Sequence, residues 1–387
     1  MSGKLIKRFD FETIINAMFL TIIFVFLFGI FFSLFNNKDG ISQEENRTLS
    51  ALPKLIDTAG INTDFPVELQ AWLSDHITFR DEIIGLNGLI QYYVFGRLDG
   101  QDLGPKGELA GIAHYEDYQH TNLKSEAEIS DIVTSVGKIA QYLKEKGTDF
   151  YYCQCWDKHT VYSEMFSPKI NQYGNISKTD QVVNAMIDRT DINVISLKEA
   201  MLNGKENGLE TYSEWNEQWH WTFRGALIGY QTIMNEINVN HQGKYKVLSD
   251  EDFEITIIDQ GDTVQGVHVP DYLEYFTLKK VNGEWYEKTS LPFIPEGRTD
   301  QNFWGVNHSA DNEDVLLVIG DSYIASKGVL YYMRASFSEV IMFNGDVVNN
   351  TETFKKLIDT YHPTIVIIEN AERVDRYDNL VNIAKDL

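Results

Sequence analysis

The chain has 387 residues, of which 43% are hydrophobic and 13% aromatic, and it carries a formal net charge of −24 with a sequence pI of about 4.7. This length suggests two or three folded units, or one large domain with an insertion, and the apolar content is ample for a packed core. Such an acidic chain is a poor candidate for nucleic-acid binding, which needs basic patches that release phosphate counterions.

The first predicted element is a membrane anchor close to the amino terminus. The 22 residues from Ile14 to Phe35 carry no charge, and roughly 20 apolar residues are enough to span a bilayer as a helix. Lys4, Lys7 and Arg8 precede this run, so the positive-inside rule places the tail in the cytoplasm and the rest of the chain outside. Because no small-residue cleavage site is evident, we predict an uncleaved single-pass anchor in the cell membrane, with a buried core helix as the alternative.

The region after the anchor is predicted to be a stalk and a helical entry segment. Residues 36–66 are polar, whereas apolar residues recur at helical spacing from Phe65 to Arg97, which indicates one or two amphipathic helices. We therefore divide the chain into a cytoplasmic tail and anchor (1–36), a stalk and entry segment (37–110) and an extracytoplasmic domain (111–387).

From about residue 110 the pattern changes to helices that alternate with short apolar strands. Capping residues mark three helix starts, namely Ser125 with Glu128, Ser177 with Asp180, and Thr222. Further helices are predicted from about Ser322 and from Thr351 to His362. The predicted strands cover residues 150–156, 192–197, 315–319, 340–343 and 364–368. Continuous apolar strands joined by helices indicate a parallel sheet covered on both faces, so we predict a three-layer α/β/α fold.

A second pattern interrupts this rhythm between about residues 241 and 305. Apolar and polar residues alternate in E-I-T-I-I-D and in Y-F-T-L-K-K-V-N-G-E-W-Y, and an Asn-Gly pair stands at 282–283. Alternation with a turn of this kind is typical of hairpins. We therefore predict a β-rich insertion in the α/β core.

The two cysteines and the histidines give little support for a metal site. Cys153 and Cys155 share one face of a predicted strand, with Cα atoms about 6.6 Å apart, which is at the edge of disulfide geometry. We interpret them as packed thiols and leave a bridge or a metal site as alternatives. The other histidines, His76, His159 and His268 among them, lack the spacing of metal ligands.

The clearest candidate for chemistry is Ser322, in V-L-L-V-I-G-D-S-Y. It follows a buried strand and begins a helix, at the edge of an open parallel sheet where ligands bind. Helix N–H groups at such a position favour a developing negative charge. The alternative is that Ser322 or Asp321 only caps the helix, and for Asp321 we favour this role over membership of a triad.

A candidate base lies in the stretch W-N-E-Q-W-H-W-T-F-R-G-A at 215–226. His220 stands there between Trp219 and Trp221, with Gln218 two positions earlier. A catalytic histidine is normally oriented by a carboxylate, which holds its tautomer and stabilises its charged form. Whether His220 has such a partner is the main question that the sequence raises.

Four segments together carry a resemblance to a known family. The block G-D-S-Y after V-L-L-V-I resembles the nucleophile block of the SGNH (GDSL-like) hydrolase superfamily, and Q-W-H-W-T-F-R-G-A resembles the histidine block of its DHHW branch, which is similar to the alginate O-acetyltransferase-like proteins. The segments D-K-H-T-V-Y at 157–162 and S-D-H-I-T-F-R-D-E at 74–82 resemble two further segments of that branch. The resemblance covers roughly residues 45–370 and implies an SGNH-like fold.

The resemblance also implies a function. Ser322 would accept an acyl group, most simply acetyl, with His220 as general base, and the group would pass to a sugar hydroxyl of a cell-surface or secreted polysaccharide. A multi-pass membrane-bound O-acyltransferase would supply the acetyl group, and no metal or diffusible cofactor would be needed. Two other functions stay open, an esterase that removes acetyl groups and a non-catalytic relative that binds polysaccharide or scaffolds the membrane acyltransferase.

The chain departs from the family pattern at one position, because the aspartate of the motif falls on Gln218. An amide can orient the imidazole, but it cannot stabilise the imidazolium as a carboxylate does. Three further residues are candidates for contact with substrate. Lys158 either lines the site or is a solvated charge at a strand end, Asn344 follows a strand and is a candidate oxyanion donor, and Trp221 either stacks on a sugar ring or packs in the core.

Overall fold

The computed structural model describes residues 11–33, 41–42, 47–57, 60–98, 101–111, 115–167, 169–189, 191–215, 220–279, 285–287, 290–297 and 299–387. Two units can be distinguished along the chain. The smaller comprises Met1–Asp99 with Thr263–Val269, and the larger comprises Gly100–Asp262 with Pro270–Leu387.

The larger unit contains a seven-stranded sheet with the strand order β13-β14-β16-β15-β17-β7-β8. Five neighbouring strands are parallel, namely β16 (Glu339–Asn344), β15 (Val315–Gly320), β17 (Ile365–Ala371), β7 (Asp149–Cys155) and β8 (Asn193–Ser196). Two antiparallel strands extend the β16 edge, β14 (Phe303–Asn307) and β13 (Trp285–Glu287). The apolar central strands are buried along nearly their whole length, as expected for strands covered on both faces.

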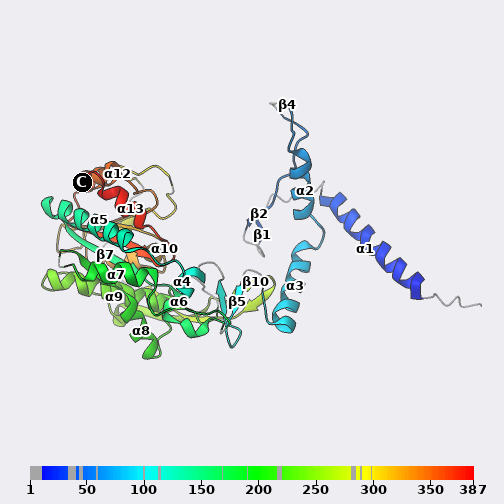
Figure 1. The fold of residues 1–387 in the computed structure, drawn as a ribbon, viewed down its shortest axis with the longest axis horizontal. Coiled ribbons are helices and arrows are strands. Elements are labelled where there is room, and N and C mark those ends of the chain that lie inside the picture. The colour runs from blue at the N-terminus through cyan, green and yellow to red at the C-terminus, as the bar shows by residue number, and fades with distance from the viewer. Residues whose placement is uncertain are drawn as a thin grey trace, which may run out of the picture. The chain divides into compact units, whose positions relative to one another are not determined.

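Helices cover both faces of this sheet (Figure 1). One layer is formed by α5 (Glu126–Glu145), α7 (Lys178–Ile187), α12 (Thr351–Tyr361) and α13 (Tyr377–Ala384). The other is formed by α8 (Lys198–Glu206), α9 (Phe223–Asn240) and α11 (Val329–Met333). The predicted three-layer α/β/α architecture with a mainly parallel sheet is therefore confirmed. Both cysteines are free and buried in β7, and burial raises the pKa of the Cys155 thiol, which disfavours the reactive thiolate.

The helix starts that the sequence marks are the ones observed. The hydroxyls of Ser125 and Ser177 accept hydrogen bonds from the backbone N–H three residues later, and the acidic side chain there bonds back, so both capping boxes are complete. Thr222 caps α9 by accepting from the N–H of Gly225 at 3.0 Å. Each start depends on contacts within four residues, which is why the local sequence was sufficient to predict it.

The helix predicted from Ser322 is shorter than expected. It ends after one turn as α10 (Ser322–Ala325), and a second short helix, α11, follows it. Between them Lys327 has φ 53° and Gly328 has φ 91°. Two successive residues in the left-handed region cannot continue a right-handed helix, so the chain must break there.

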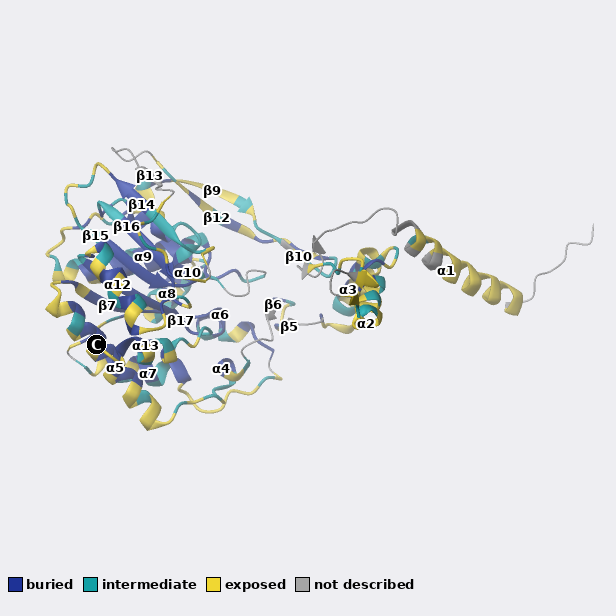
Figure 2. Ribbon diagram, turned by 90° about the horizontal axis from the view of Figure 1, so that it is seen from above, coloured by how far each residue is buried: buried dark blue, intermediate teal, exposed yellow. Residues whose placement is uncertain are grey.

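The insertion contains β-strands as predicted, but the two strands on either side of the Asn-Gly pair, β12 (Tyr272–Leu278) and β13, lie in different sheets, so the expected pairing between them is wrong. β9 (Phe253–Asp259) pairs antiparallel with β12 (Tyr272–Leu278), and β10 (Asp262–Val264) pairs with β11 (Val267–Val269). Figure 2 shows β9 largely exposed, in contrast to the buried central strands. β13 and β14 join the main sheet, while the predicted Asn-Gly turn at 282–283 lies outside the described residues. Shorter elements of the larger unit are β5 (Gln101–Leu103), β6 (Leu109–Gly111), α4 (Tyr115–Gln119) and α6 (Lys158–Val161).

The smaller unit holds three helices among its described residues, α1 (Phe11–Ser33), α2 (Phe65–Asp75) and α3 (Arg80–Phe95). Its short strand pairs are β1 (Ile41–Ser42) with β2 (Arg47–Thr48) and β3 (Ile56–Asp57) with β4 (Gly60–Ile61). Of the two alternatives for the entry segment, two helices are observed, with a break before Phe79 at φ 60°. No helix within the described residues combines the length and the apolar character that a membrane crossing requires. The anchor therefore stays a prediction from the sequence.

Candidate active site

The candidate site lies at the carboxyl edge of the parallel sheet. Ser322 follows β15 by two positions, and the strands β16, β17 and β7 end at the same edge. Asn344 is the last residue of β16, Arg373 follows β17 by two positions, and Asp157 follows β7 by two positions. Ligands of open parallel sheets bind at this edge, where the strand ends leave backbone and side-chain groups exposed.

Ser322 and His220 meet at this edge although 102 positions separate them in the sequence. Nε2 of His220 lies 2.7 Å from Oγ of Ser322, which is hydrogen-bond distance. His220 is held from its carboxyl side, because Trp221 bridges to Tyr212 and the N–H of Thr222 donates to the carbonyl of Thr211 at 3.0 Å. A serine hydroxyl bonded to an imidazole nitrogen is the arrangement from which a base can remove the serine proton.

The turn before Ser322 is fixed by Asp321. Its Oδ1 accepts from the N–H of Tyr323 at 2.9 Å, which caps α10. Its Oδ2 accepts from the N–H of Ala371 at 3.2 Å and forms an ion pair with Arg376 at 2.9 Å. Asp321 therefore caps the helix, which is the role that the sequence favoured over membership of a catalytic triad.

Glu369 supports the same turn from β17. Its Oε2 accepts from the N–H of Asp321 at 2.8 Å, and a Cβ placed on Gly320 would lie 2.6 Å from that oxygen. Only glycine therefore fits at position 320 without a shift of the carboxyl group. Burial, together with the nearby Asp321 carboxylate, raises the pKa of Glu369 to about 8, so Glu369 is mainly protonated at neutral pH and does not repel Asp321.

A second group of side chains lies beside His220. Oδ1 of Asp157 accepts from the hydroxyl of Tyr323 and from the guanidinium of Arg373, and Oδ2 accepts from the backbone N–H of Arg373 at 2.8 Å. Nη2 of Arg373 lies 3.5 Å from Nε2 of His220. The Arg373 side chain is only 10% exposed. Through these contacts the Asp157–Arg373 ion pair brings a fixed cation next to the Ser322–His220 pair.

Sequence reasoning did not single out Asp157 or give Arg373 a role. Asp157 begins the segment D-K-H-T-V-Y that carried part of the family resemblance, and Arg373 follows a predicted strand. The contact between them spans 216 positions and depends on β7 and β17 being neighbours. The signal available in the sequence was the placement of both residues just after apolar strands, because the carboxyl ends of adjacent parallel strands meet.

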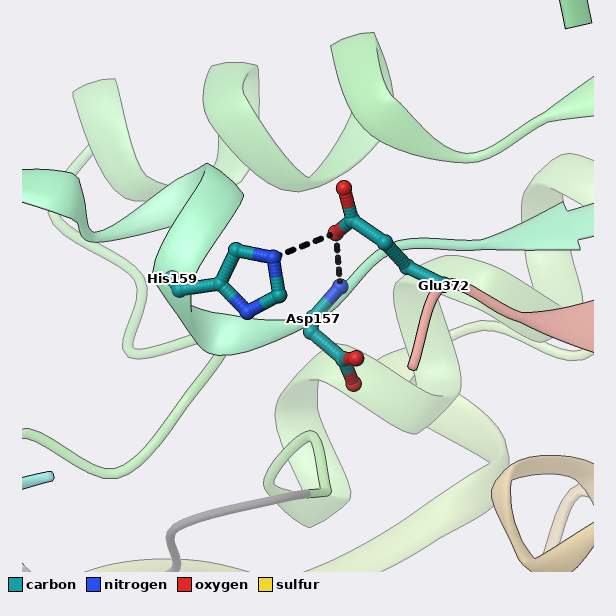
Figure 3. Close-up of side chains that lie close together, drawn as sticks. All are labelled: Asp157, His159 and Glu372. Carbon is teal, nitrogen blue, oxygen red and sulfur yellow. Dashed lines mark hydrogen bonds and ion pairs between the residues drawn. The ribbon is translucent and has the colours of Figure 1, made fainter. Parts of the chain in front are cut away.

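Asp157 is itself held by Glu372 (Figure 3). Oε2 of Glu372 accepts from the backbone N–H of Asp157 at 3.0 Å and from the hydroxyl of Thr160 at 2.7 Å, and it lies 3.4 Å from Nε2 of His159. Burial opposes a charge on His159, but the Glu372 carboxylate outweighs it with help from Asp157 and Asp117, and the pKa of His159 rises to about 9. His159 is therefore an imidazolium at neutral pH, buried against a carboxylate.

Asp157, His159 and Glu372 also offer ligand atoms within 4.8 Å of one another, close enough to suggest a cation site. The atoms that would bind a cation are, however, already engaged by other protein groups. The Asp157 carboxylate accepts from Tyr323 and Arg373 and is turned away from Glu372 (Figure 3). An imidazolium has no lone pair to give to a metal, and metal binding would require its deprotonation. We therefore interpret the three residues as an ion network that positions Asp157.

Lys158, predicted to line the site or to be solvated, is buried. Its Nζ donates to the backbone carbonyls of Leu109 and Glu214, both at 3.2 Å. Burial lowers the pKa of Lys158 to about 8, although Asp271 and other nearby carboxylates oppose the shift. The solvated alternative is wrong because the ammonium lies among protein groups, and in this arrangement it ties the β6 strand to the segment before His220.

Asn344 lies where the sequence placed it, at the end of β16 and fully buried. Its Nδ2 donates to Oε1 of Gln301, and its Oδ1 accepts from the N–H of Asp346 at 2.7 Å. One N–H of the Asn344 amide is thus used by Gln301. Because the amide nitrogen carries a second N–H, the role of Asn344 as an oxyanion donor stays a prediction.

Trp221 does not have the position that sugar stacking requires. The side chain is fully buried, and its ring packs edge-on against Tyr323 with centroids 5.1 Å apart. Of the two alternatives for Trp221, sugar stacking is therefore wrong and core packing is confirmed. Gln218 and Trp219 lie outside the described residues, so the proposed exchange of the motif aspartate for an amide stays a statement about the sequence.

Of the comparisons with known proteins, the comparison with solved structures finds similar folds. No family model matches the chain, and no curated protein matches it. Among solved structures it is similar to PatB1 of Bacillus cereus with a sulfonyl adduct, at 17% identity and a TM-score of 0.53, over 72% of this chain and 96% of that one.

Two further solved structures are similar at lower scores. A DHHW family protein from Eubacterium siraeum has 13% identity and a TM-score of 0.49 over 74% of this chain and 96% of that one. The O-acetyltransferase domain of Pseudomonas putida AlgJ has 16% identity and a TM-score of 0.43 over 71% and 91%. The chain therefore has the fold of PatB1, and the solved structures similar to it include a DHHW family protein and an O-acetyltransferase domain, the two groups that its motifs resemble.

Proposed function

We propose that the protein is an O-acetyltransferase-like enzyme that transfers acetyl groups to a cell-surface or secreted polysaccharide through Ser322 and His220. The observation that carries this proposal is the 2.7 Å separation of Ser322 Oγ and His220 Nε2 at the carboxyl edge of the sheet. The capped turn at Asp321 supports it, because it presents the serine at a helix start. The motif resemblance supplies the polysaccharide as substrate class.

The chemistry has two balanced halves. As Oγ of Ser322 attacks the carbonyl carbon of the acetyl donor, His220 Nε2 takes the serine proton and the carbonyl π electrons move onto the oxygen. When the bond to the leaving oxygen breaks, His220 returns the proton to it and Ser322 is left acetylated. A sugar hydroxyl then attacks the acetyl-serine, His220 takes its proton, and the proton returns to Oγ as the product leaves.

We further propose that the enzyme is anchored in the cell membrane by residues 14–35, with the larger unit outside. The uncharged run and the basic residues before it support this placement. A membrane-bound O-acyltransferase would then be the partner that supplies acetyl groups. No metal or diffusible cofactor enters the proposed chemistry, since Ser322 and His220 carry both halves of the reaction.

Two alternative functions are each supported by a specific observation. A polysaccharide esterase would use the same serine chemistry with water in place of the sugar hydroxyl, and the Ser322–His220 geometry fits it equally. A non-catalytic polysaccharide-binding or scaffold protein is favoured by the amide Gln218 at the position of the motif aspartate. Detection of an acetyl-enzyme separates both enzymes from the scaffold, and the acceptor then separates transferase from esterase.

The experiment uses the full chain purified in detergent and incubated with an activated acetyl ester. Intact mass spectrometry after rapid quenching should show one added acetyl group, mapped to Ser322, and ester cleavage should be lost in Ser322→Ala. Ser326→Ala is the matched control, because among the described residues the Ser326 hydroxyl bonds the carbonyl of Tyr323 at 3.5 Å. Equal ester cleavage by the Ser322→Ala and wild-type proteins would show that Ser322 is not the nucleophile.

A further inference from the structure

Aromatic side chains meet beside the candidate site at the start of α9. Phe223 is the first residue of α9 and stands three positions after His220, and it is partly exposed, unlike the buried Trp221. Its ring meets the ring of Tyr275 from β12 at a centroid distance of 4.8 Å and an interplanar angle of 76°. Tyr275 is 38% exposed. Phe223 and Tyr275 therefore present an aromatic surface to solvent next to the histidine block.

A lysine from the serine block borders the same surface. Lys327 stands five positions after Ser322. Its Nζ lies 4.9 Å from the centre of the Phe223 ring and donates to Oε1 of Gln260, the residue after β9, at 3.3 Å. The Lys327 backbone has φ 53°, a left-handed conformation that persists only where the surrounding structure holds it. The histidine block, the serine block and the insertion, which supplies Gln260 and Tyr275, thus meet at one place.

This surface lies within reach of the reacting atoms. Three residues of chain span at most about 11 Å, which bounds the distance between the Cα atoms of His220 and Phe223. Nε2 of His220 in turn lies 2.7 Å from Oγ of Ser322. A sugar polymer that places one hydroxyl at Ser322 can therefore lay the same sugar unit, or the next one, against the Phe223 and Tyr275 rings.

The chemistry of the surface fits a sugar ring. A pyranose has a face of C–H groups bordered by hydroxyls, and small-molecule sites combine aromatic side chains with a few placed polar groups. Phe223 and Tyr275 supply the aromatic rings, and Lys327 and Gln260 supply polar groups at their border. Packing alone gains less from a tyrosine that stays 38% exposed. The net charge of −24 repels a polyanion, which favours a neutral polysaccharide.

We propose that Tyr275 and Phe223 form a stacking subsite for a hexopyranose ring of a neutral polysaccharide, with Lys327 and Gln260 at its polar border. The inference rests on the proposed function for its choice of ligand, because it gives a place to the sugar that accepts the acetyl group. The subsite binds and orients that sugar and takes no part in bond making. It also gives the β-rich insertion a role, since the insertion carries Tyr275 and Gln260 to the edge of the site.

The test measures binding, which does not require turnover. The full chain, in a detergent without a sugar head group, is titrated by calorimetry with β-linked hexasaccharides of glucose, mannose and N-acetylglucosamine. Tyr275→Leu should raise the Kd of the hexasaccharide that the wild type binds best at least about tenfold, because leucine is apolar but has no flat face. Tyr275→Phe keeps the ring and should stay within about threefold of the wild-type Kd. Phe223→Leu tests the second ring and should also weaken binding.

Tyr142→Leu is the matched control. Tyr142 is also partly exposed, and Nζ of Lys146 lies 5.7 Å from the centre of its ring. It stands near the end of α5, just before β7 begins, and so lies at the amino edge of the sheet, opposite the candidate site. Its replacement should leave the Kd unchanged.

The outcomes separate the inference from the proposed function. A loss of binding in Tyr275→Leu that Tyr275→Phe and Tyr142→Leu do not share establishes the stacking subsite. Equal Kd values for the wild-type and Tyr275→Leu proteins overturn it, and so does a wild-type protein that binds none of the three hexasaccharides. An equal loss in Tyr275→Phe also overturns stacking, because the hydroxyl would then carry the binding. Acetylation of Ser322 judges the proposed function separately, so a protein that binds the sugar but is never acetylated keeps the subsite and loses the reaction.

Discussion

His159 provides a stability test that does not depend on any substrate. Its ring is buried, 6% exposed, and Nε2 lies 3.4 Å from the Glu372 carboxylate. The pKa of His159 is about 9 in the folded protein against 6.5 for an ordinary histidine. At about 1.4 kcal/mol for each pH unit, this rise corresponds to roughly 3 kcal/mol of stabilisation, to order of magnitude. Replacing His159 with glutamine should remove this stabilisation and leave Glu372 without its charged partner.

The sign of the pH dependence follows from the direction of the shift. A group whose folded pKa is raised contributes its full stabilisation below the unfolded pKa and loses it as the pH rises through the folded pKa. The wild-type protein should therefore exceed His159→Gln in the free energy of unfolding by about 3 kcal/mol at pH 6, and this difference should shrink toward zero by about pH 9.5. Glu369 and Lys158 also titrate in this range, but they are present in both proteins and cancel in the difference.

The measurement is chemical unfolding of the full chain at pH 6, 7, 8 and 9.5, followed by tryptophan fluorescence. His120→Gln serves as the control for removal of a histidine, since the His120 ring bonds the carbonyl of Gly174 at 3.3 Å in an exposed position and is not fully buried. A difference between wild type and His159→Gln that is the same at every pH would refute the buried ion pair. The loss would then reflect packing alone.

Two further predictions concern the turn and the anchor. Gly320→Ala should lower ester cleavage at least about tenfold and destabilise the fold by about 1–3 kcal/mol. The added methyl would lie 2.6 Å from Glu369 Oε2 and would displace the turn that presents Ser322. Unchanged kcat and melting temperature would show that the turn tolerates a Cβ. A reporter that functions only outside the cytoplasm, fused after residue 60 of the chain, should be active because of the charge asymmetry around residues 14–35, and activity of a strictly cytoplasmic reporter at that position would contradict the anchor.

The parts of the fold that depend on local pattern could be predicted from the sequence. The five parallel strands were located by their continuous apolar runs, and Ser125, Ser177 and Thr222 marked helix starts because capping acts within one turn. The end of α10 was missed because nothing in S-Y-I-A-S-K by itself forces Lys327 into the left-handed region. The burial of Lys158 was missed, and core packing of Trp221 was only one of two alternatives, because burial depends on segments far away in the chain.

The candidate site shows the same division. Ser322 and His220 belong to recognisable sequence blocks, and the structure brings them into contact. The Asp157–Arg373 ion pair forms because β7 and β17 are neighbours in the sheet. In the sequence the two strands are more than 200 positions apart. A single sequence does not state which parallel strands lie side by side. The electrostatic environment of the site could therefore be read only after the topology was known.

The strand order also sharpens the question raised by Gln218. The contacts that join the Asp157 carboxylate to His220 run through Arg373, and both Asp157 oxygens already accept hydrogen bonds. Asp157 is thus poorly placed to replace the motif aspartate, and the amide at 218 should limit the rate. Gln218→Asp should raise kcat at least about tenfold, roughly 1.4 kcal/mol of transition-state stabilisation, because a carboxylate both fixes the imidazole tautomer and offsets the charge that forms on it. Gln218→Asp with His220→Ala should be inactive. If Gln218→Asp and Gln218→Ala both lower the rate, the amide is part of a working site, and the chain has an orienting group of a kind that the family motif does not suggest.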